Sequence, residues 1–169
     1  LINYLMNKKS TLAVVAISYN EEVDIPGFLE HLIEWVDEIV IVDSGSTDCT
    51  LEIINKSTFD IKLVKTTLEK AGGYAALRNL GVEGCNSDWV INMDIDERIT
   101  ENLKAEILIS INKDKYNAFR YRRLNYFLHR PMKAGGWNSW NNPQLARKGA
   151  HYYEGNLHEK CNVQGGDFK

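Results

Sequence analysis

The sequence predicts an α/β fold, in which a Rossmann-like, mostly parallel sheet with flanking helices spans residues 11 to about 97. Short apolar, β-branched runs recur along this region, and stretches with helical spacing of apolar residues lie between them. The first, second and fourth runs are nearly continuously apolar, which indicates strands that are buried on both faces. Alternation of such strands with helices favours right-handed crossovers and therefore parallel pairing.

The predicted strands are Thr11–Ser18, Glu38–Asp43, Ile61–Thr66 and Asp88–Met93. The helices between them are predicted at residues 26–35, 51–56 and 74–82. Pro26 suits the first turn of the first helix, and the hydroxyl and carboxylate groups of residues 44–48 suit the start of the second. The third helix is expected to stop at Gly84.

From Thr100 onward the pattern changes. A further amphipathic helix is predicted to open at Thr100 and Glu101, with one apolar face made of Leu103, Ile107, Leu108 and Ile111. Less regular strands and loops are predicted after it, at the Tyr-, Arg-, Asn- and Trp-rich segments 118–124, 126–128 and 144–147. Such a composition is typical of a surface that binds something polar. We expect residues 1–169 to form one domain, with a regular half (residues 11–99) and an irregular half (residues 100–169).

The composition excludes several classes of protein. The length of 169 residues suits one domain, and apolar and charged contents of 44% and 25% are those of a globular chain. The net charge of −3 argues against a general nucleic-acid binder. The longest apolar stretch, Leu12–Ile17, is too short to span a membrane, and the N-terminus does not resemble a signal peptide. Three widely separated cysteines argue against a disulfide framework or a zinc site and indicate reduced thiols in a reducing compartment.

Acidic side chains follow three of the predicted strands at the point where each strand ends. The segments are Ser18-Tyr19-Asn20-Glu21-Glu22, Asp43-Ser44-Gly45-Ser46 and Asp94-Ile95-Asp96-Glu97. In an open parallel sheet, ligands bind outside the carboxyl ends of the strands. Each carboxylate alone also fits a helix cap, an alternative open for Glu22, Asp24 and Asp43. Three of them at one edge favour a binding site.

The pair Asp94 and Asp96 is the sharpest feature. It follows the buried run 89–93, and two carboxylates two residues apart lie on the same side of an extended chain. Because like charges held close together repel, such a pair needs a cation. Oxygen ligands suit Mg²⁺ or Mn²⁺, which typically bridge to phosphates. The alternative is a solvated loop.

Three further features have both a functional and a structural interpretation. Arg78 lies on the helix before the fourth strand and could bind a phosphate or an acidic residue at the strand ends. The structural alternative is an exposed helix arginine. His158 and Glu159 are adjacent but lack the second histidine of a zinc-binding helix, so a surface pair is the alternative. Trp137 and Trp140 suit a platform for a sugar ring or core packing under a loop. The absence of a phosphate-binding loop and of a dinucleotide fingerprint disfavours a P-loop enzyme or a dehydrogenase.

Four motifs, in order along residues 12 to about 100, resemble family 2 glycosyltransferases. They are Val14–Glu22, Ile39–Thr50, Arg78-Asn79 and Asp94–Arg98. More narrowly, the tail resembles bacterial lipopolysaccharide-core β-glucosyltransferases at residues 135–137, 144–149 and 158–159. The resemblance implies the A-type glycosyltransferase (GT-A) fold, a nucleotide-sugar donor, a divalent cation (Mg²⁺ or Mn²⁺) and inversion at the anomeric carbon.

The resemblance also implies roles for individual residues. The implied nucleotide-sugar site consists of Ser18, Tyr19, Asn20, Glu22, Asp43, Ser44, Arg78, Asp94 and Asp96. The nucleoside would lie near Asn20 and Glu22, with Asp43 on the base or ribose. Asp94 would face the ribose or donor sugar, and Asp96 would hold the metal. The expected acceptor contacts are Trp137, Trp140 and His158.

Two departures from the family pattern matter. Many members supply the general base from a Glu-Asp pair, whereas here only His158-Glu159 is present. Glu159 is therefore the expected base, with Glu154 and Asp167 as alternatives. The chain also ends at Lys169, sooner than family members usually do, so we expect a C-terminal part for acceptor binding or membrane docking to be missing.

The expected reaction moves a sugar from a nucleotide-diphospho-sugar such as a UDP-hexose to a glycan or lipid-linked saccharide, in cell-envelope or lipopolysaccharide synthesis. Such an enzyme would be cytoplasmic, with peripheral contact to the inner face of the membrane and no nucleic-acid partner. Two other functions stay open. One is a non-catalytic module that binds sugar nucleotides or glycans. The other is a phosphatase with an aspartate nucleophile, which uses a D-x-D pair after its first strand and has Thr or Val where Arg98 stands.

Overall fold

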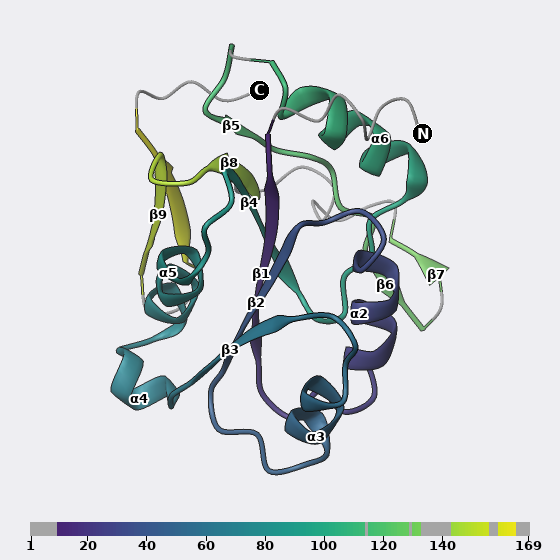
Figure 1. Cartoon of the computed structure of the whole chain (residues 1–169), viewed down its shortest axis with the longest axis vertical. Coiled ribbons are helices and arrows are strands. Elements are labelled where there is room, and N and C mark those ends of the chain that lie inside the picture. Colours follow the sequence, from purple (N-terminus) through teal and green to yellow (C-terminus); the bar gives the residue numbers. More distant parts are fainter. Residues whose placement is uncertain (1–9, 114, 129, 133–142, 156–158, 165–169) are drawn as a thin grey trace.

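The computed structural model describes residues 10–113, 115–128, 130–132, 143–155 and 159–164. Its central sheet has six strands in the spatial order β3 (Ile61–Lys65), β2 (Glu38–Asp43), β1 (Leu12–Ser18), β4 (Trp89–Asp94), β8 (Leu145–Arg147) and β5 (Ala118–Phe119). Strands β1 to β4 pair in parallel, whereas β8 runs antiparallel to both β4 and β5. Figure 1 shows β1 at the centre of this arrangement. The predicted mostly parallel α/β sheet is confirmed.

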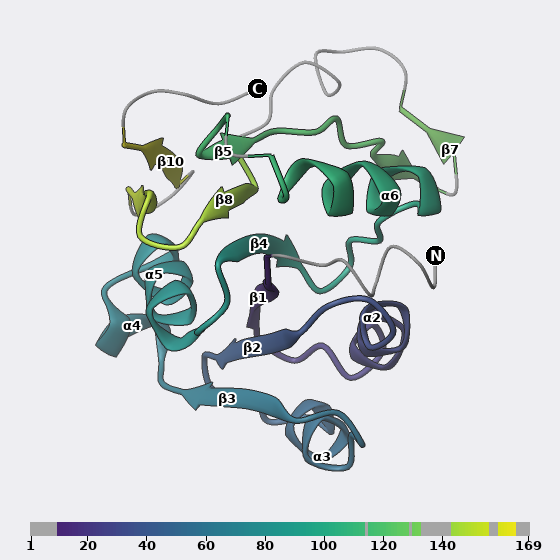
Figure 2. The same ribbon diagram turned by 45° about the horizontal axis from the view of Figure 1, so that its top comes forward.

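The predicted strands of the regular half form within one residue of their expected bounds. The helices are α2 (Ile25–Leu32), α3 (Thr50–Asn55), α4 (Leu68–Ala71), α5 (Tyr74–Gly84) and α6 (Glu101–Ser110). Figure 2 shows α4 and α5 on one side of the sheet and α2, α3 and α6 on the other. Two details differ from the prediction: α2 ends at Leu32 instead of Trp35, and the single-turn α4 was not predicted.

Successive residues of β1 pack into opposite layers of the core. Leu12, Val14 and Ala16 belong to the larger cluster, with α2, α3 and α6. Ala13 and Val15 belong to a smaller cluster, with the end of α5. Because both faces of β1 are covered, its residues from Leu12 to Ile17 are all apolar, as the sequence pattern indicates.

Helix α5 lies very close to the sheet at Gly81. A Cβ atom added there would lie 2.2 Å from Cγ1 of Val15 and 3.2 Å from Cγ2 of Val42. Val15 is fully buried, and its β-branched side chain has little rotational freedom. The close approach of α5, which also carries Arg78, therefore depends on glycine at this position.

Gly81→Ala is expected to be less stable than Gly84→Ala, because overpacking of the contact with Val15 costs about 1–3 kcal/mol. This cost is opposed by the roughly 1 kcal/mol that alanine gains over glycine in a helix. Gly84→Ala is the matched control, since its Cβ would lie at an ordinary 3.4 Å from Cγ1 of Val40. Urea unfolding measures both variants. A Gly81→Ala variant that is as stable as Gly84→Ala would show that α5 can move off the sheet without cost.

The irregular half differs more from its prediction. Of the segment 118–124, predicted as less regular strand and loop, only Ala118–Phe119 forms a strand, and residues 120–125 form no ladder and are mostly exposed. The segment 126–128 contributes only β6 (Tyr126–Phe127), which pairs with β7 (Arg130–Pro131). An antiparallel hairpin of β9 (His151–Glu154) and β10 (Lys160–Val163) was not predicted. Figure 1 shows β9 beside α5, and the two elements are in contact.

Two expectations about the cellular setting can be compared with the structure. No helix in the described part of the chain is long and apolar enough to cross a membrane. The three cysteines are free thiols. Cys85 and Cys161 are buried, whereas Cys49 is exposed directly before α3.

Candidate active site

The carboxyl ends of β1, β2 and β4 meet at one edge of the sheet. In the ladders, Ser18 is paired with Asp43 and Ile17 with Asp94. The loops that follow these strands therefore share this edge, which we call the donor edge. Arg78 reaches it from α5.

Asp43 is 1% exposed and organises the turn after β2. Its carboxylate accepts hydrogen bonds from two backbone N–H groups of that turn, both at 3.0 Å, and from the hydroxyls of Ser18 and Ser46. The Ser44 hydroxyl donates to the carbonyl oxygen of Ser18 at 3.1 Å. The alternative in which Asp43 caps the next helix is wrong, because α3 begins only at Thr50. Contact between this turn and a nucleotide stays a prediction.

Side chains after β1 tie the first loop of the donor edge to the second. Asn20 has a φ of 57°, in the left-handed region that asparagine tolerates well, and its Oδ1 accepts a hydrogen bond from the Thr47 N–H at 2.8 Å. Glu22 Oε2 accepts one from the Cys49 N–H at 2.9 Å. Tyr19, in contrast, is 60% exposed. Asn20 and Glu22 therefore shape the loops, while Tyr19 presents its ring to solvent.

Arg78 connects two carboxylates that are far apart in the sequence. Its Nη2 donates to Asp94 Oδ1 and its Nε to Glu159 Oε1, both at 2.7 Å. The side chains of Arg78 and Glu159 are 13% and 18% exposed, and that of Asp94 is 43% exposed. Burial alone would lower the pKa of Arg78, but the two carboxylates outweigh burial and raise it. The acidic-partner interpretation of Arg78 is confirmed, and Glu159 is brought to the donor edge.

A second arginine, which the sequence analysis missed, approaches the same aspartate. Arg123 Nη1 lies 2.5 Å from Glu97 Oε1 and 3.8 Å from Asp94 Oδ2. Glu97 in turn accepts a hydrogen bond from the backbone N–H of Asp94 at 3.1 Å. Arg123 lies in the irregular segment between β5 and β6, where no periodic pattern distinguishes it from Arg120 and Arg122.

Comparison with known proteins identifies the family. The model of the family described as Glycosyl transferase family 2 matches residues 13–165. The chain belongs to glycosyl transferase family 2. A curated relative, LpsC of Rhizobium meliloti (strain 1021), is named a lipopolysaccharide core biosynthesis glycosyltransferase and is 30% identical over 152 residues, which are 88% of this chain and 55% of LpsC. The chain spans about half the length of the curated relatives it matches.

Solved structures place the family 2 chain in a known fold. TarS of S. aureus matches with a TM-score of 0.57 at 21% identity, over 85% of this chain and 50% of that one. Glucosyl-3-phosphoglycerate synthase from Mycobacterium tuberculosis was solved in complex with Mn²⁺, UDP and glucosyl-3-phosphoglycerate. It matches with a TM-score of 0.53 at 22% identity, over 66% of this chain and 43% of that one. The GT-A fold implied by the sequence motifs is confirmed.

The donor edge of this family 2 chain is rich in acidic side chains, whose oxygens suit a divalent cation. The pKa of Glu21 is raised, first by burial and then by the negative charges of Asp24, Asp96, Asp48 and Asp94. Asp96 is exposed within this negative surrounding. In the described ranges, no group of three or more His, Cys, Asp or Glu side chains could hold a metal. Mg²⁺ and Mn²⁺ fit such a place when one carboxylate and substrate phosphates share the coordination.

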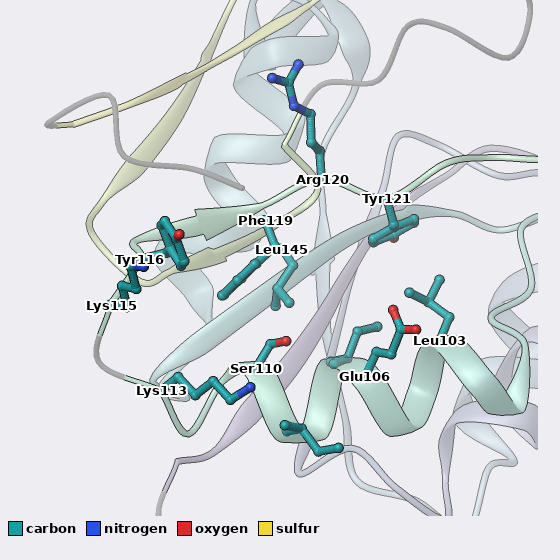
Figure 3. Close-up of a pocket in the computed structure, with 12 residues that line it drawn as sticks. Leu103, Glu106, Ser110, Lys113, Lys115, Tyr116, Phe119, Arg120, Tyr121 and Leu145 are labelled. Atoms are coloured by element: carbon teal, nitrogen blue, oxygen red, sulfur yellow. The ribbon is translucent and has the colours of Figure 1, made fainter.

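A separate cavity of about 620 Å³ lies between α6 and the segment around β5 (Figure 3). Lys113 and Lys115 lie at one end of it and Tyr121 at the other, with Leu145 among the apolar lining (Figure 3). The pKa of Tyr121 is raised, mainly by burial and then by the charge of Glu97. The Tyr121 end of the cavity therefore lies near the acidic groups of the donor edge.

The remaining predicted site residues are those of the acceptor. Trp137, Trp140 and His158 lie outside the described residues, as does Asp167. Their roles in a family 2 enzyme stay predictions. Glu154, the alternative base on β9, is exposed and accepts a hydrogen bond from Asn162 Nδ2 at 2.8 Å.

Proposed function

We propose that this chain binds a nucleotide-diphospho-sugar and transfers the sugar, with inversion at the anomeric carbon, to a saccharide acceptor. The observation that carries the proposal is Arg78 between Asp94 and Glu159. One cation joins a carboxylate at the end of β4 to a carboxylate delivered by the irregular half. Membership of family 2 supports glycosyl transfer, and the meeting of three strand ends supports a nucleotide at this edge.

The donor would lie along the donor edge, with its nucleoside against the loops after β1 and β2 and its diphosphate toward Arg78. A guanidinium suits a diphosphate as well as a carboxylate, because both accept two parallel hydrogen bonds. A bound Mg²⁺ or Mn²⁺ ion, held by Asp96, would supply further positive charge to the leaving diphosphate. UDP is proposed as the nucleotide because a structural neighbour was solved with UDP and Mn²⁺.

Glu159 is proposed as the general base. Its carboxylate takes the proton of an acceptor hydroxyl while the hydroxyl oxygen forms a bond to the anomeric carbon. The bond from that carbon to the diphosphate oxygen breaks with its electron pair, and the nucleoside diphosphate leaves. Because Glu159 is bound to Arg78 in the structure, it must share or exchange this contact before it accepts a proton.

Residues 11–99 are proposed as the donor half and residues 100–169 as the acceptor-side half. The name of LpsC supports a glycan or lipid-linked saccharide as the acceptor, in synthesis of the cell envelope. Trp137, Trp140 and His158 are proposed as acceptor contacts. The enzyme would then work in the cytoplasm, at the inner face of the membrane where such acceptors are built.

A non-catalytic module that binds a sugar nucleotide is the second candidate function. The contact between Glu159 and Arg78 favours this function, because the ion pair occupies the carboxylate that would act as the base. Incubation with UDP-glucose and Mn²⁺, without an acceptor, separates the two functions. Slow release of glucose supports the transferase, whereas UDP-glucose binding without hydrolysis supports the module.

Asp96→Asn is expected to abolish the part of UDP binding that depends on Mn²⁺. The melting temperature of the unliganded protein should change by only a few degrees, because Asp96 is exposed. Thermal-shift titrations with UDP, with and without Mn²⁺, measure both. Asp60→Asn is the matched control, an exposed carboxylate before β3 at the opposite edge of the sheet, and should keep the Mn²⁺ effect. A Mn²⁺ effect that persists in Asp96→Asn would assign the metal to another carboxylate.

A further inference from the structure

The side chain of Asn79 pairs with the backbone of β9. Its Nδ2 donates to the carbonyl oxygen of Tyr153 at 2.9 Å, and its Oδ1 accepts from the Tyr153 N–H at 2.8 Å. One amide side chain thus forms the two bonds that a residue of a neighbouring strand would form. Tyr153 is paired with Cys161 of β10 in the hairpin. The Tyr153 N–H and C=O groups, which lie at the edge of β9 away from β10, therefore have their hydrogen-bond partners on α5.

The hairpin depends on α5 for its place. A two-stranded hairpin is only marginally stable in water. Its buried apolar contacts form a small cluster, in which Tyr153 and Cys161 pack with Ala75 of α5. The guanidinium of Arg78 lies 5.8 Å from the centre of the Tyr153 ring. Beside these contacts, the paired hydrogen bonds of Asn79 fix which residue of β9 meets which turn of α5.

Glu159 immediately precedes β10 and moves with the hairpin. Lys160, the first residue of β10, is paired with Glu154, the last residue of β9. A shift of β9 along α5 therefore displaces Glu159 as well. The Glu159 carboxylate meets the Nε of Arg78 at 2.7 Å, and Arg78 precedes Asn79 on the helix. Two adjacent residues of α5 therefore hold the hairpin. Asn79 binds the backbone of β9, and Arg78 binds the Glu159 carboxylate next to β10.

We infer that Asn79 is a positioning residue, which fixes the β9–β10 hairpin on α5 so that Glu159 faces the donor edge. The inference rests on the proposed function, because it takes Glu159 as the carboxylate that serves the acceptor. An amide is required because it donates and accepts at the same time. Aspartate would accept from the Tyr153 N–H but place a second acceptor against the Tyr153 carbonyl. Leucine would offer neither bond.

The first test needs no activity. The exchange protection of the Arg78 Nε–H, measured by NMR, reports the bond to Glu159. We expect this protection to fall at least tenfold in Asn79→Asp and Asn79→Leu. It should be unchanged in Asn55→Asp, the control at the exposed end of α3. Unchanged protection in both Asn79 variants would overturn the inference, whether or not the protein transfers sugar.

The second test separates turnover from donor binding. The kcat for sugar transfer should fall about tenfold or more in the Asn79 variants, since a misplacement of about 1 Å can cost a hundredfold. The Kd for UDP should stay within about threefold. If the Asn79 variants lose the exchange protection of the Arg78 Nε–H but keep the kcat of the wild type, Asn79 has a purely structural role and the inference is overturned. If the wild type binds UDP but transfers no sugar, the proposed function fails, and the Arg78 signal still decides the positioning. If Asn79→Leu does not fold, the nearly isosteric Asn79→Asp carries both tests.

Discussion

Replacing Arg78 with methionine should weaken UDP binding by at least tenfold, or about 1.4 kcal/mol, and lower the melting temperature of the unliganded protein. The guanidinium donates hydrogen bonds to both Asp94 and Glu159. Methionine would remove this shared cation and leave Asp94 with the more distant Arg123, 3.8 Å away. Like charges in a partly buried place repel. Removing one partner of a fully buried ion pair costs about 3–5 kcal/mol. The loss of stability should be smaller here, because Asp94 is 43% exposed and solvent screens it.

Charge alone should not restore the function of Arg78. Arg78→Lys is expected to bind UDP nearly as weakly as Arg78→Met, because an ammonium lacks the rigid, planar set of donors that meets two carboxylates. Arg122→Met removes the same charge from an exposed position and should leave UDP affinity unchanged. Isothermal titration with UDP and Mn²⁺, together with thermal unfolding, measures these effects. A lower melting temperature with unchanged UDP affinity would limit Arg78 to a role in folding.

The regular half of the fold could be predicted because its signals are local. Strands such as β1 and β4 are mostly apolar because both of their faces are covered, and this pattern is visible within a few residues. The strand-end position of Asp43 and Asp94 followed from the same runs. The single turn of α4 was missed because it buries none of its residues and so leaves no apolar pattern.

The contacts of the irregular half could not be predicted because they join distant residues. Arg78 and Glu159 are 81 positions apart, and their pairing depends on a hairpin of eight paired residues with only a small apolar cluster. The same holds for Arg123, whose partner Glu97 is 26 positions away. In a sequence, a charged loop residue that forms an ion pair cannot be distinguished from one that is solvated, because only the fold brings the partners together. The role of Glu159 came from the family resemblance, and its contact with Arg78 came from the structure.

The largest effect on turnover is expected from Glu159→Gln, which should lower the rate of sugar transfer by roughly a hundredfold or more. Glutamine keeps the shape of the side chain and an acceptor oxygen for the Nε of Arg78, so the hairpin should keep its place. A neutral amide, however, does not take up the proton of an attacking hydroxyl. The Kd for UDP should therefore change little. Initial rates of transfer to an oligosaccharide acceptor, alongside UDP titrations, measure the two effects separately.

Glu154→Gln is both the matched control and the rival assignment. Glu154 lies on the same hairpin, but it is exposed and bonded to Asn162, so its replacement should leave turnover close to that of the wild type. The opposite pattern, with normal turnover in Glu159→Gln and a large loss in Glu154→Gln, would move the base to β9. A hundredfold loss in Glu159→Gln with unchanged UDP affinity would assign Glu159 to the acceptor side of the reaction. Arg78 would then be the link between the two substrates, since the same guanidinium holds Glu159 and Asp94.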